Sequence, residues 1–271
     1  IAEYGSKTAK TVHVMTEMER RVYADRAEHL GDPDFWEVPA EELLDDDYIK
    51  RRVEQIDLTA ATDSETVRAL ELGNLVESEQ TTHYSIVDAE GNAVSLTTTI
   101  NSGYGSKVFV EGAGFLLNNE MDDFSSKPGV PNVYGLLGGA ANAIQPGKRM
   151  LSAMTPTILE KDGELFMVVG TPGGSTIITS VYQTILNVVD HGMSMTEAVS
   201  ARRIHSQWKP DVIYIESGAL EESVKEELQR LGHELKPRGS IGRVDAILVR
   251  PDGSYEGAAD PRGDDWAIGL K

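Results

Sequence analysis

The sequence contains no cysteine, which excludes disulfides, thiol catalysis and thiolate metal sites without assigning the chain to a compartment. It also contains no apolar run as long as a membrane-spanning helix requires. Basic residues are few, because 25 Lys and Arg stand against 44 Asp and Glu, and the net charge is −19. So acidic a chain is unsuited to an extended phosphate-binding face, and we expect no nucleic-acid partner.

The first ten residues lack the charged-then-apolar order of a signal peptide, and Ile1 stands where an initiator Met would. We therefore expect that the chain was trimmed or is a fragment. Its 271 residues, 40% of them apolar, are enough to bury a sizeable core in one large domain or two small ones.

The character of the sequence changes at residue 81, which divides the chain into a region 1–80 and a region 81–271. Upstream, helical spacing predicts a helix over 9–30 and another that Pro39 opens, which the run 45–56 either continues or follows as a second helix. A linker without periodicity follows. Arg26 interrupts the apolar stripe of the first helix, which consists of Val12, Met15, Met18 and Val22. Downstream, the patterns predict three hairpins and two main helices: strands 81–88 with 93–100, 156–160 with 165–171, and 244–250 with 254–259, and helices 175–190 and 219–231.

The bond between Gln80 and Thr81 joins an acidic linker to a strand-like run rich in β-branched residues. Cleavage there would free an α-amine beside a threonine hydroxyl, and that amine could act as the base for its own side chain. The alternative reading is a linker followed by an edge strand that happens to begin with Thr-Thr. Taken alone, the run favours this second reading.

A second candidate is the run Pro-Gly-Gly-Ser at 172–175, between a strand and a helix. Gly173 and Gly174 at a helix start would expose backbone N–H groups, which suits an oxyanion hole. A phosphate loop is disfavoured because no lysine follows the glycines, and a tight turn that needs glycine remains the structural alternative.

Several polar residues fall at strand ends or in loops, where binding groups are commonly displayed: Asn101, Glu120, Asp122, Asp123 and Ser152. In so acidic a chain such groups are equally well explained as solvated side chains. The six histidines show no metal-ligand spacing, and no Gly-x-Ser-x-Gly elbow is present, so we expect neither a metal site, a cofactor nor a serine triad. Tyr134 lies in a long Gly- and Pro-rich loop of the kind that forms lids.

Five runs in order along the chain resemble the gamma-glutamyltransferase (gamma-glutamyl transpeptidase) family of N-terminal nucleophile hydrolases: 81–85 (TTHYS), 116–124 (LLNNEMDDF), 127–135 (KPGVPNVYG), 154–157 (MTPT) and 170–174 (GTPGG). Upstream, 23–26 (YADR) and 30–35 (LGDPDF) resemble the end of that family's large subunit. The resemblance implies an α+β fold, the αββα sandwich, with 81–271 as the small subunit. It also implies a periplasmic or extracellular location, a gamma-glutamyl donor such as glutathione, and water or an amino acid as acceptor.

The resemblance also assigns roles. Gln80-Thr81 would be the autocleavage bond, Thr81 the nucleophile and Thr99 its supporting hydroxyl, with Gly173 and Gly174 as oxyanion hole. The α-amino end of the donor would be held by Asn101, Glu120 and Asp123, its α-carboxylate by Ser152, and the covering lid would be the loop 128–139 with Tyr134.

The chain departs from the family pattern in two respects. Ala153 stands where the family has a second serine, so one hydrogen-bond donor to the substrate carboxylate is missing. Most of a large subunit is also missing, including the segment in which the family places a carboxylate-binding arginine. Two alternatives therefore stay open: an unprocessed or inactive fragment acting as a structural or assembly module, and an acylase for bulkier amides.

Overall fold

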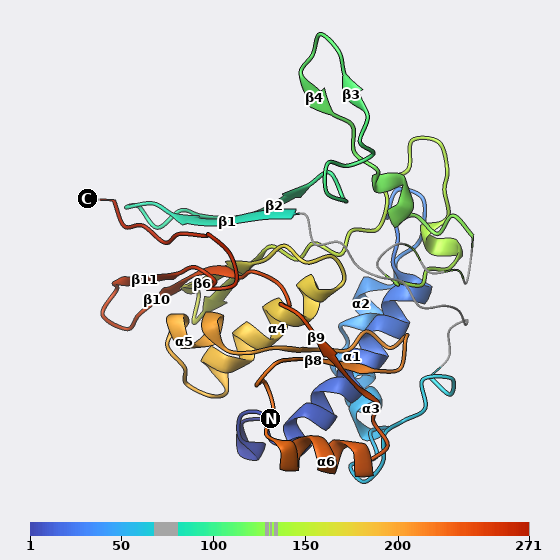
Figure 1. Ribbon diagram of the computed structural model, residues 1–271, viewed down its shortest axis with the longest axis vertical. Coiled ribbons are helices and arrows are strands. Elements are labelled where there is room, and N and C mark those ends of the chain that lie inside the picture. Colours follow the sequence, from blue (N-terminus) through green and yellow to red (C-terminus); the bar gives the residue numbers. More distant parts are fainter. Residues whose placement is uncertain (68–80, 128–129, 131, 133–134, 271) are drawn as a thin grey trace.

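The computed structural model describes residues 1–67, 81–127, 130, 132 and 135–270. Gln80 and Tyr134 lie outside the described residues, as does much of the expected lid loop. Figure 1 shows two sheets lying face to face, with helices beneath them.

The larger sheet has four antiparallel strands in the order β11-β10-β6-β5. The strands are β5 (Thr157–Lys161), β6 (Glu164–Gly170), β10 (Asp245–Val249) and β11 (Tyr255–Ala258). Two helices cover its inner face: α4 (Thr176–Val189) and α5 (Met195–Ser200). The apolar side chains between them form one core cluster, each contributing about 1.5–3 kcal/mol by burial: Met167, Val169, Val181, Met195, Val199 and Val244 among others.

The other face of this sheet carries a two-stranded hairpin of β1 (Thr81–Val87) and β2 (Ala93–Thr99). The hairpin is held by the Ser85 hydroxyl, which donates to the Asp245 carbonyl, and by the Ser95 hydroxyl, which donates to the Val169 carbonyl, at 3.1 and 3.2 Å. The predicted hairpins 81–88/93–100, 156–160/165–171 and 244–250/254–259 are thus confirmed.

The outer face of the hairpin is open in the part of the chain described. Tyr84 and Ile86 of β1 are 42% and 51% exposed, and Val94 of β2 is 45% exposed. The helices, the four-stranded sheet and the hairpin therefore form three layers of the αββα sandwich (Figure 1). No described helix covers the outer face of the hairpin, where the fourth layer would lie.

A second cluster lies below, around the long helix α1 (Ala9–His29). Helix α1 packs there against a three-stranded sheet and against the helix α6 (Glu222–Arg230). The strands of this sheet follow the order β7-β8-β9: β7 (Ile204–His205), β8 (Ile213–Glu216) and β9 (Leu235–Arg238). The predicted helices 175–190 and 219–231 correspond to α4 and α6. Of the two possibilities left open for 39–56, the structure has two helices, α2 (Ala40–Leu43) and α3 (Asp46–Glu54). A small hairpin of β3 (Phe109–Val110) and β4 (Phe115–Leu116) projects from the top of the molecule in Figure 1.

The apolar stripe predicted for α1 is wrong at its end, because Val22 is 57% exposed. The helix instead buries charged side chains of its other faces. Glu17 forms ion pairs with Arg21 at 2.7 Å and with Arg20 at 3.4 Å, and it also accepts a hydrogen bond from the Thr62 amide. Buried charges persist where they are paired and hydrogen-bonded, so this helix is fixed by ion pairs as much as by its apolar side.

None of the described helices is long and apolar enough to cross a membrane.

The close packing of the β1–β2 hairpin on the four-stranded sheet depends on Gly170, because a Cβ built there would overlap the His83 ring of β1. We predict that Gly170→Ala displaces β1 and lowers the free energy of unfolding by about 1–3 kcal/mol, as overpacking does. Thermal and urea unfolding measure this loss. Gly239→Ala is the matched control, because a Cβ there meets nothing within 4 Å. An equal effect of both substitutions would contradict the proposed role of the His83 contact.

Candidate active site

Thr81 is the first residue of β1 and lies directly opposite Thr99, the last residue of β2. The Thr81 hydroxyl donates to the Thr99 hydroxyl oxygen at 3.3 Å, and the same oxygen accepts the Asn101 amide at 2.8 Å. Asn101 has φ +75°, the left-handed conformation that asparagine tolerates well. Its side-chain amide, buried with the rest of the residue, donates to the Asn119 carbonyl. Thr81 and Thr99 are therefore held at one end of the hairpin.

The phase of β1 decides which way Thr81 faces. Thr81, His83 and Ser85 lie on the less exposed side of the strand, and Thr82 and Tyr84 lie on the exposed side. His83 hydrogen-bonds Thr97 and Ser85, and burial lowers its pKa to about 4. Its imidazole is thus neutral near pH 7 and is occupied within the sheet interface.

Gly173 and Gly174 form the turn between β6 and α4. Gly174 has φ +55°, a left-handed value, and Gly173 has φ +142°. The turn is fixed by the Gly173 carbonyl, which accepts the Thr176 amide and hydroxyl, and by Tyr23, whose hydroxyl donates to the Ser175 carbonyl at 2.7 Å. The N–H groups at the start of α4 carry the positive end of the helix dipole.

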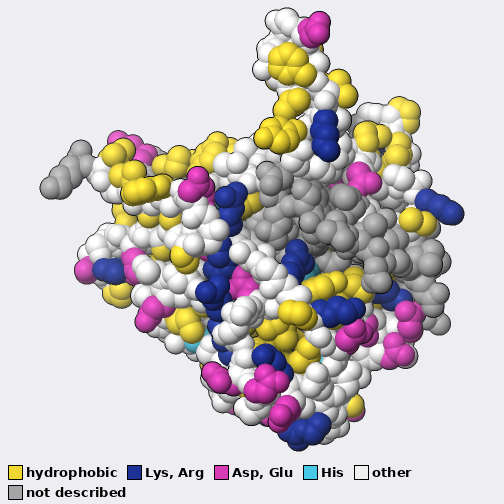
Figure 2. Space-filling view, viewed as in Figure 1, with side chains coloured by type: hydrophobic (Ala, Val, Ile, Leu, Met, Phe, Trp, Pro, Cys, Tyr) yellow, Lys and Arg dark blue, Asp and Glu magenta, His cyan; other side chains and the backbone are white. Residues whose placement is uncertain are grey.

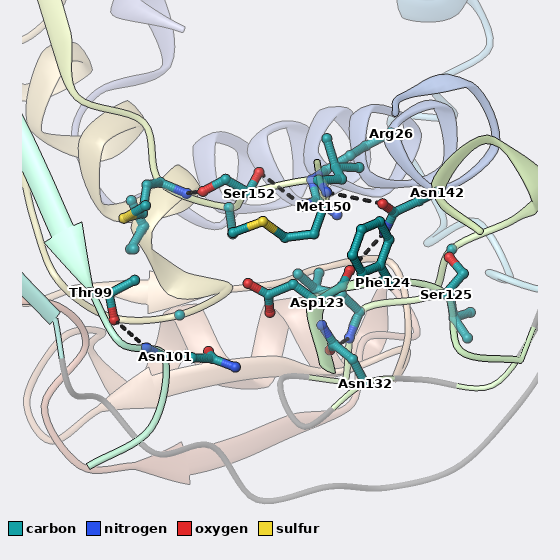
Figure 3. A pocket seen from close by; sticks show the side chains of 18 of the residues that line it. Arg26, Thr99, Asn101, Asp123, Phe124, Ser125, Asn132, Asn142, Met150 and Ser152 are labelled. Carbon is teal, nitrogen blue, oxygen red and sulfur yellow. Dashed lines mark hydrogen bonds between the residues drawn. The ribbon is translucent and has the colours of Figure 1, made fainter. Parts of the chain in front are cut away.

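One pocket gathers most of the predicted site residues (Figure 3). It has about 600 Å³ of empty volume, counting its open mouth. Six of the residues to which the sequence assigned a catalytic or binding role line it: Thr81, Thr99, Asn101, Asp123, Ser152 and Gly174. Gly173 and Glu120 are not among its lining residues. Glu120 opens the short 3-10 helix Glu120–Asp123 beside the pocket.

Asp123 is the only carboxylate among the described lining residues. Burial, together with the nearby negative charges of Glu120 and Asp122 and against the opposing charge of Arg26, raises the pKa of Asp123 to about 7. The segment is fixed by Asn142, whose side chain donates to the Asp123 carbonyl at 2.7 Å. Asp123 in an empty pocket is therefore partly protonated near neutral pH, and an ammonium group would favour its ionised form.

Arg26 is a lining residue to which sequence reasoning assigned no role in the site, although it was noted as a break in an apolar stripe and as part of the run 23–26. It lies in the last turn of α1, is 8% exposed, and is the only cation among the described lining residues. Its guanidinium donates to the Ser152 carbonyl at 3.2 Å, as Figure 3 shows. Its position could have identified it, because a charged residue at a helix position where the spacing predicts a buried side chain needs a polar partner or a functional role.

Ser152 and Ala153 follow one another along the pocket wall. The Ser152 hydroxyl accepts the Met154 amide at 3.0 Å, so its proton stays able to donate to a ligand. Ala153, half-buried, packs its methyl group against the apolar cluster that contains Tyr23 and Trp208. The wall thus offers one hydroxyl and one methyl where the pattern of the resembled family has two hydroxyls.

A group of potential metal-ligating side chains, which sequence spacing did not reveal, lies outside the pocket. His13, Glu17 and His233 come together although His233 is 220 residues from His13. Each already has a protein partner, because the two imidazoles contact at 2.7 Å, His13 also meets the Asp57 carbonyl, and Glu17 holds arginines. Burial, with the nearby His13 and Arg20, lowers the pKa of His233 to about 4.

A family model described as Gamma-glutamyltranspeptidase matches residues 1–270. The chain belongs to this family. It is 47% identical over 269 residues to the glutathione hydrolase proenzyme of Escherichia coli (strain K12), covering 99% of this chain and 46% of that protein. It is 35% identical over 272 residues to the acylase ACY 1 proenzyme of Pseudomonas sp. (strain SE83), covering all of this chain and 45% of that one. The chain spans about half the length of the curated relatives it matches.

Solved structures agree with the observed fold. A gamma-glutamyltranspeptidase from Pseudomonas nitroreducens complexed with L-DON is 51% identical with TM-score 0.67, covering 70% of this chain and all of that one. A cephalosporin acylase from Bacillus halodurans is 25% identical with TM-score 0.78, covering 96% of this chain and 45% of that one. The predicted family and the α+β N-terminal nucleophile hydrolase fold are confirmed.

The raised pKa of Asp123 predicts a pH-dependent stability. The folded pKa is about 7 and the usual value is 3.8, so the folded state binds more protons between these values and loses stability as the pH rises through them. We predict that Asp123→Asn removes this loss, with a stabilisation that is absent near pH 4 and reaches about 1–2 kcal/mol at pH 8, allowing for solvent at the pocket mouth.

Urea unfolding from pH 4 to pH 8 measures the effect. Glu226→Gln, an equal charge change on the exposed side of α6, is the control and should show no such trend. A constant difference between Asp123→Asn and the parent protein across this range would contradict the assignment.

Proposed function

We propose that the chain carries the nucleophile half of an enzyme that transfers or hydrolyses gamma-glutamyl groups, activated by cleavage of the Gln80-Thr81 bond. The observation that carries this proposal is that one pocket contains the Thr81 hydroxyl, the start of α4 at Gly174, one carboxylate and one cation. A hydroxyl nucleophile beside helix-start N–H groups suits acyl transfer.

The charges of the pocket favour the amino-acid end of a gamma-glutamyl donor. Asp123 and Asn101 offer oxygens to an α-ammonium group, with Glu120 contributing negative charge from the next turn. Ser152 offers a hydroxyl to the α-carboxylate, on the side where the only described lining cation, Arg26, lies. A zwitterion fits such a pair of opposite charges better than a neutral amide would.

The reaction then follows from the arrangement. The freed α-amine of Thr81, with an ordinary pKa of about 7.7–8.0, takes the hydroxyl proton as Oγ1 forms a bond to the γ-carbonyl carbon. The Thr99 hydroxyl orients Oγ1, and the N–H groups of Gly173 and Gly174 stabilise the oxyanion. Collapse breaks the C–N bond, and the proton leaves with the amine. Water or an amino-acid amine resolves the ester and restores Thr81.

The open face of the β1–β2 hairpin supports a further partner within the same protein. Tyr84, Ile86 and Val94 offer an apolar surface on the side where the sandwich has no described layer. We propose that the remaining large-subunit portion covers this face, and that the mature protein works in the periplasm or outside the cell, as the family resemblance implies. The lid role of Tyr134 remains a prediction.

One alternative keeps specific support. The Ala153 methyl on the pocket wall and the similarity to acylases favour an enzyme for bulkier amides. The other alternative, an unprocessed module with a structural or assembly role, differs from the enzyme in keeping the Gln80-Thr81 bond intact.

Thr81→Ala is predicted to abolish both self-cleavage and turnover, because it removes the attacking oxygen. Thr81→Ser should retain both, and Thr82→Ala, on the exposed side of β1, should change neither. Mass spectrometry reports cleavage as two species of 80 and 191 residues, and hydrolysis of a gamma-glutamyl anilide reports turnover. Activity of the Thr81→Ala protein would refute the mechanism.

Ala153→Ser is predicted to lower KM for a gamma-glutamyl anilide about tenfold with little change in kcat. The reason is that a hydroxyl donor to a carboxylate contributes about 1.5–3 kcal/mol. Ser152→Ala should raise KM by a similar factor. If Ala153→Ser instead leaves KM unchanged while hydrolysis of a cephalosporin side-chain amide exceeds that of the anilide, the acylase reading replaces the gamma-glutamyl one.

A further inference from the structure

A second pocket lies between the first turns of α1 and the second half of α4, and it shares no lining residue with the pocket around Thr81. It has about 410 Å³ of empty volume, counting its open mouth. Five apolar side chains line it: Val12, Met15, Leu186, Ile204 and Leu220. Lys7, His191 and Arg202 also line it, so this pocket combines apolar walls with two cations and an imidazole.

The two cations of this pocket take no part in the ion pairs near them. Below lies a buried network in which Arg203 pairs with Asp260 at 2.8 Å, and Arg262 pairs with Glu216 at 2.6 Å and with Asp260 at 2.9 Å. Two cations and two anions balance one another there. In the part of the chain described, neither Lys7 nor Arg202 has an ion-pair partner.

Lys7 is held where an unpaired ammonium group is unfavourable. It lies in the turn before α1 with φ +57°, a left-handed value that is uncommon for a residue with a side chain. Burial lowers the pKa of its ammonium group, and Arg262, Arg202 and Arg203 lower the pKa further, against the single opposing charge of Glu216. An anion bound beside Lys7 would offset both the desolvation and the repulsion.

The local charge stands out against the chain as a whole, whose net charge is −19. Figure 2 shows Lys and Arg side chains in a column that runs down the middle of one face, with acidic side chains around it. Because the overall charge repels anions, an anionic ligand needs a local excess of cations such as Lys7 and Arg202 provide.

We propose that this pocket binds a small organic carboxylate with a short apolar body, its carboxylate between Lys7 and Arg202 and its chain against Val12 and Leu220. Arg202 can form paired hydrogen bonds to a carboxylate, and Lys7 adds a compact positive charge. The apolar walls distinguish such a ligand from an inorganic anion.

The two pockets are connected through the same two helices. α1 places Val12 at this pocket and Arg26 at the other, and α4 places Ile177 at the other pocket and Asn187 at this one. The binding proposal stands without the function proposed for the Thr81 pocket, so its test measures binding alone.

Isothermal titration of the intact chain with hexanoate tests the proposal. Saturable binding of one hexanoate is expected, with hexan-1-ol and sulfate each binding at least tenfold more weakly. The double variant Lys7→Met, Arg202→Gln should weaken hexanoate binding at least tenfold. The double variant Lys161→Met, Arg250→Gln, which removes the same charge from the four-stranded sheet, should bind like the parent.

A second measurement does not depend on how well a variant folds. Hexanoate should protect Lys7 of the parent chain from acetylation by an amine-reactive ester, while exposed Lys10 stays reactive, as read by peptide mass spectrometry. Lys7→Arg should bind hexanoate within about threefold of the parent. Equal hexanoate binding by the Lys7→Met, Arg202→Gln variant, equal binding of sulfate, or acetylation of Lys7 unaffected by hexanoate would each overturn the proposal.

Discussion

The close contact between the His83 ring and Gly170 is the constraint on which the rest of the site depends. It lets the β1–β2 hairpin approach the four-stranded sheet closely enough for Ser85 and Ser95 to donate to that sheet's carbonyls. Thr81 begins the strand that carries His83, and Gly174 follows the strand that ends at Gly170. One contact between the sheets thus sets both the candidate nucleophile and the helix start opposite it.

Helix α1 forms another wall of the Thr81 pocket, and it holds the neighbouring segments through polar side chains. Its Tyr23 hydroxyl holds the first turn of α4, and its Arg26 holds the Ser152 segment. Glu17, Arg20 and Arg21 fix the helix through buried ion pairs, which cost much to break because each partner would be left charged and buried. Helix α1 therefore contributes directly to the pocket, through Arg26.

Much of the fold could be predicted from the sequence, because hairpins and amphipathic helices are local patterns. Period-two alternation identified β1, the turn at 88–92 identified its partner β2, and the Lys161-Asp162-Gly163 turn identified the β5–β6 hairpin. The prediction was wrong at Val22, since α1 also has a face of paired charges. That face contacts residues distant in the chain, because Glu17 accepts the Thr62 amide and Arg20 pairs with Asp211. Spacing along the chain cannot detect such pairs.

The candidate site, like the fold, was predictable from the sequence only in part. The sequence by itself determined the residue types: a threonine opening a strand, two glycines before a helix, an acidic turn, and an alanine in place of a serine. Only the tertiary structure decided that Thr81 lies opposite Thr99 on the less exposed side of β1, that Asp123 has a raised pKa, that Arg26 lines the pocket, and that Lys7 and Arg202 share a second pocket. The physical reason is that burial and the proximity of charges depend on residues distant in the chain, whereas local patterns fix only the elements that carry them.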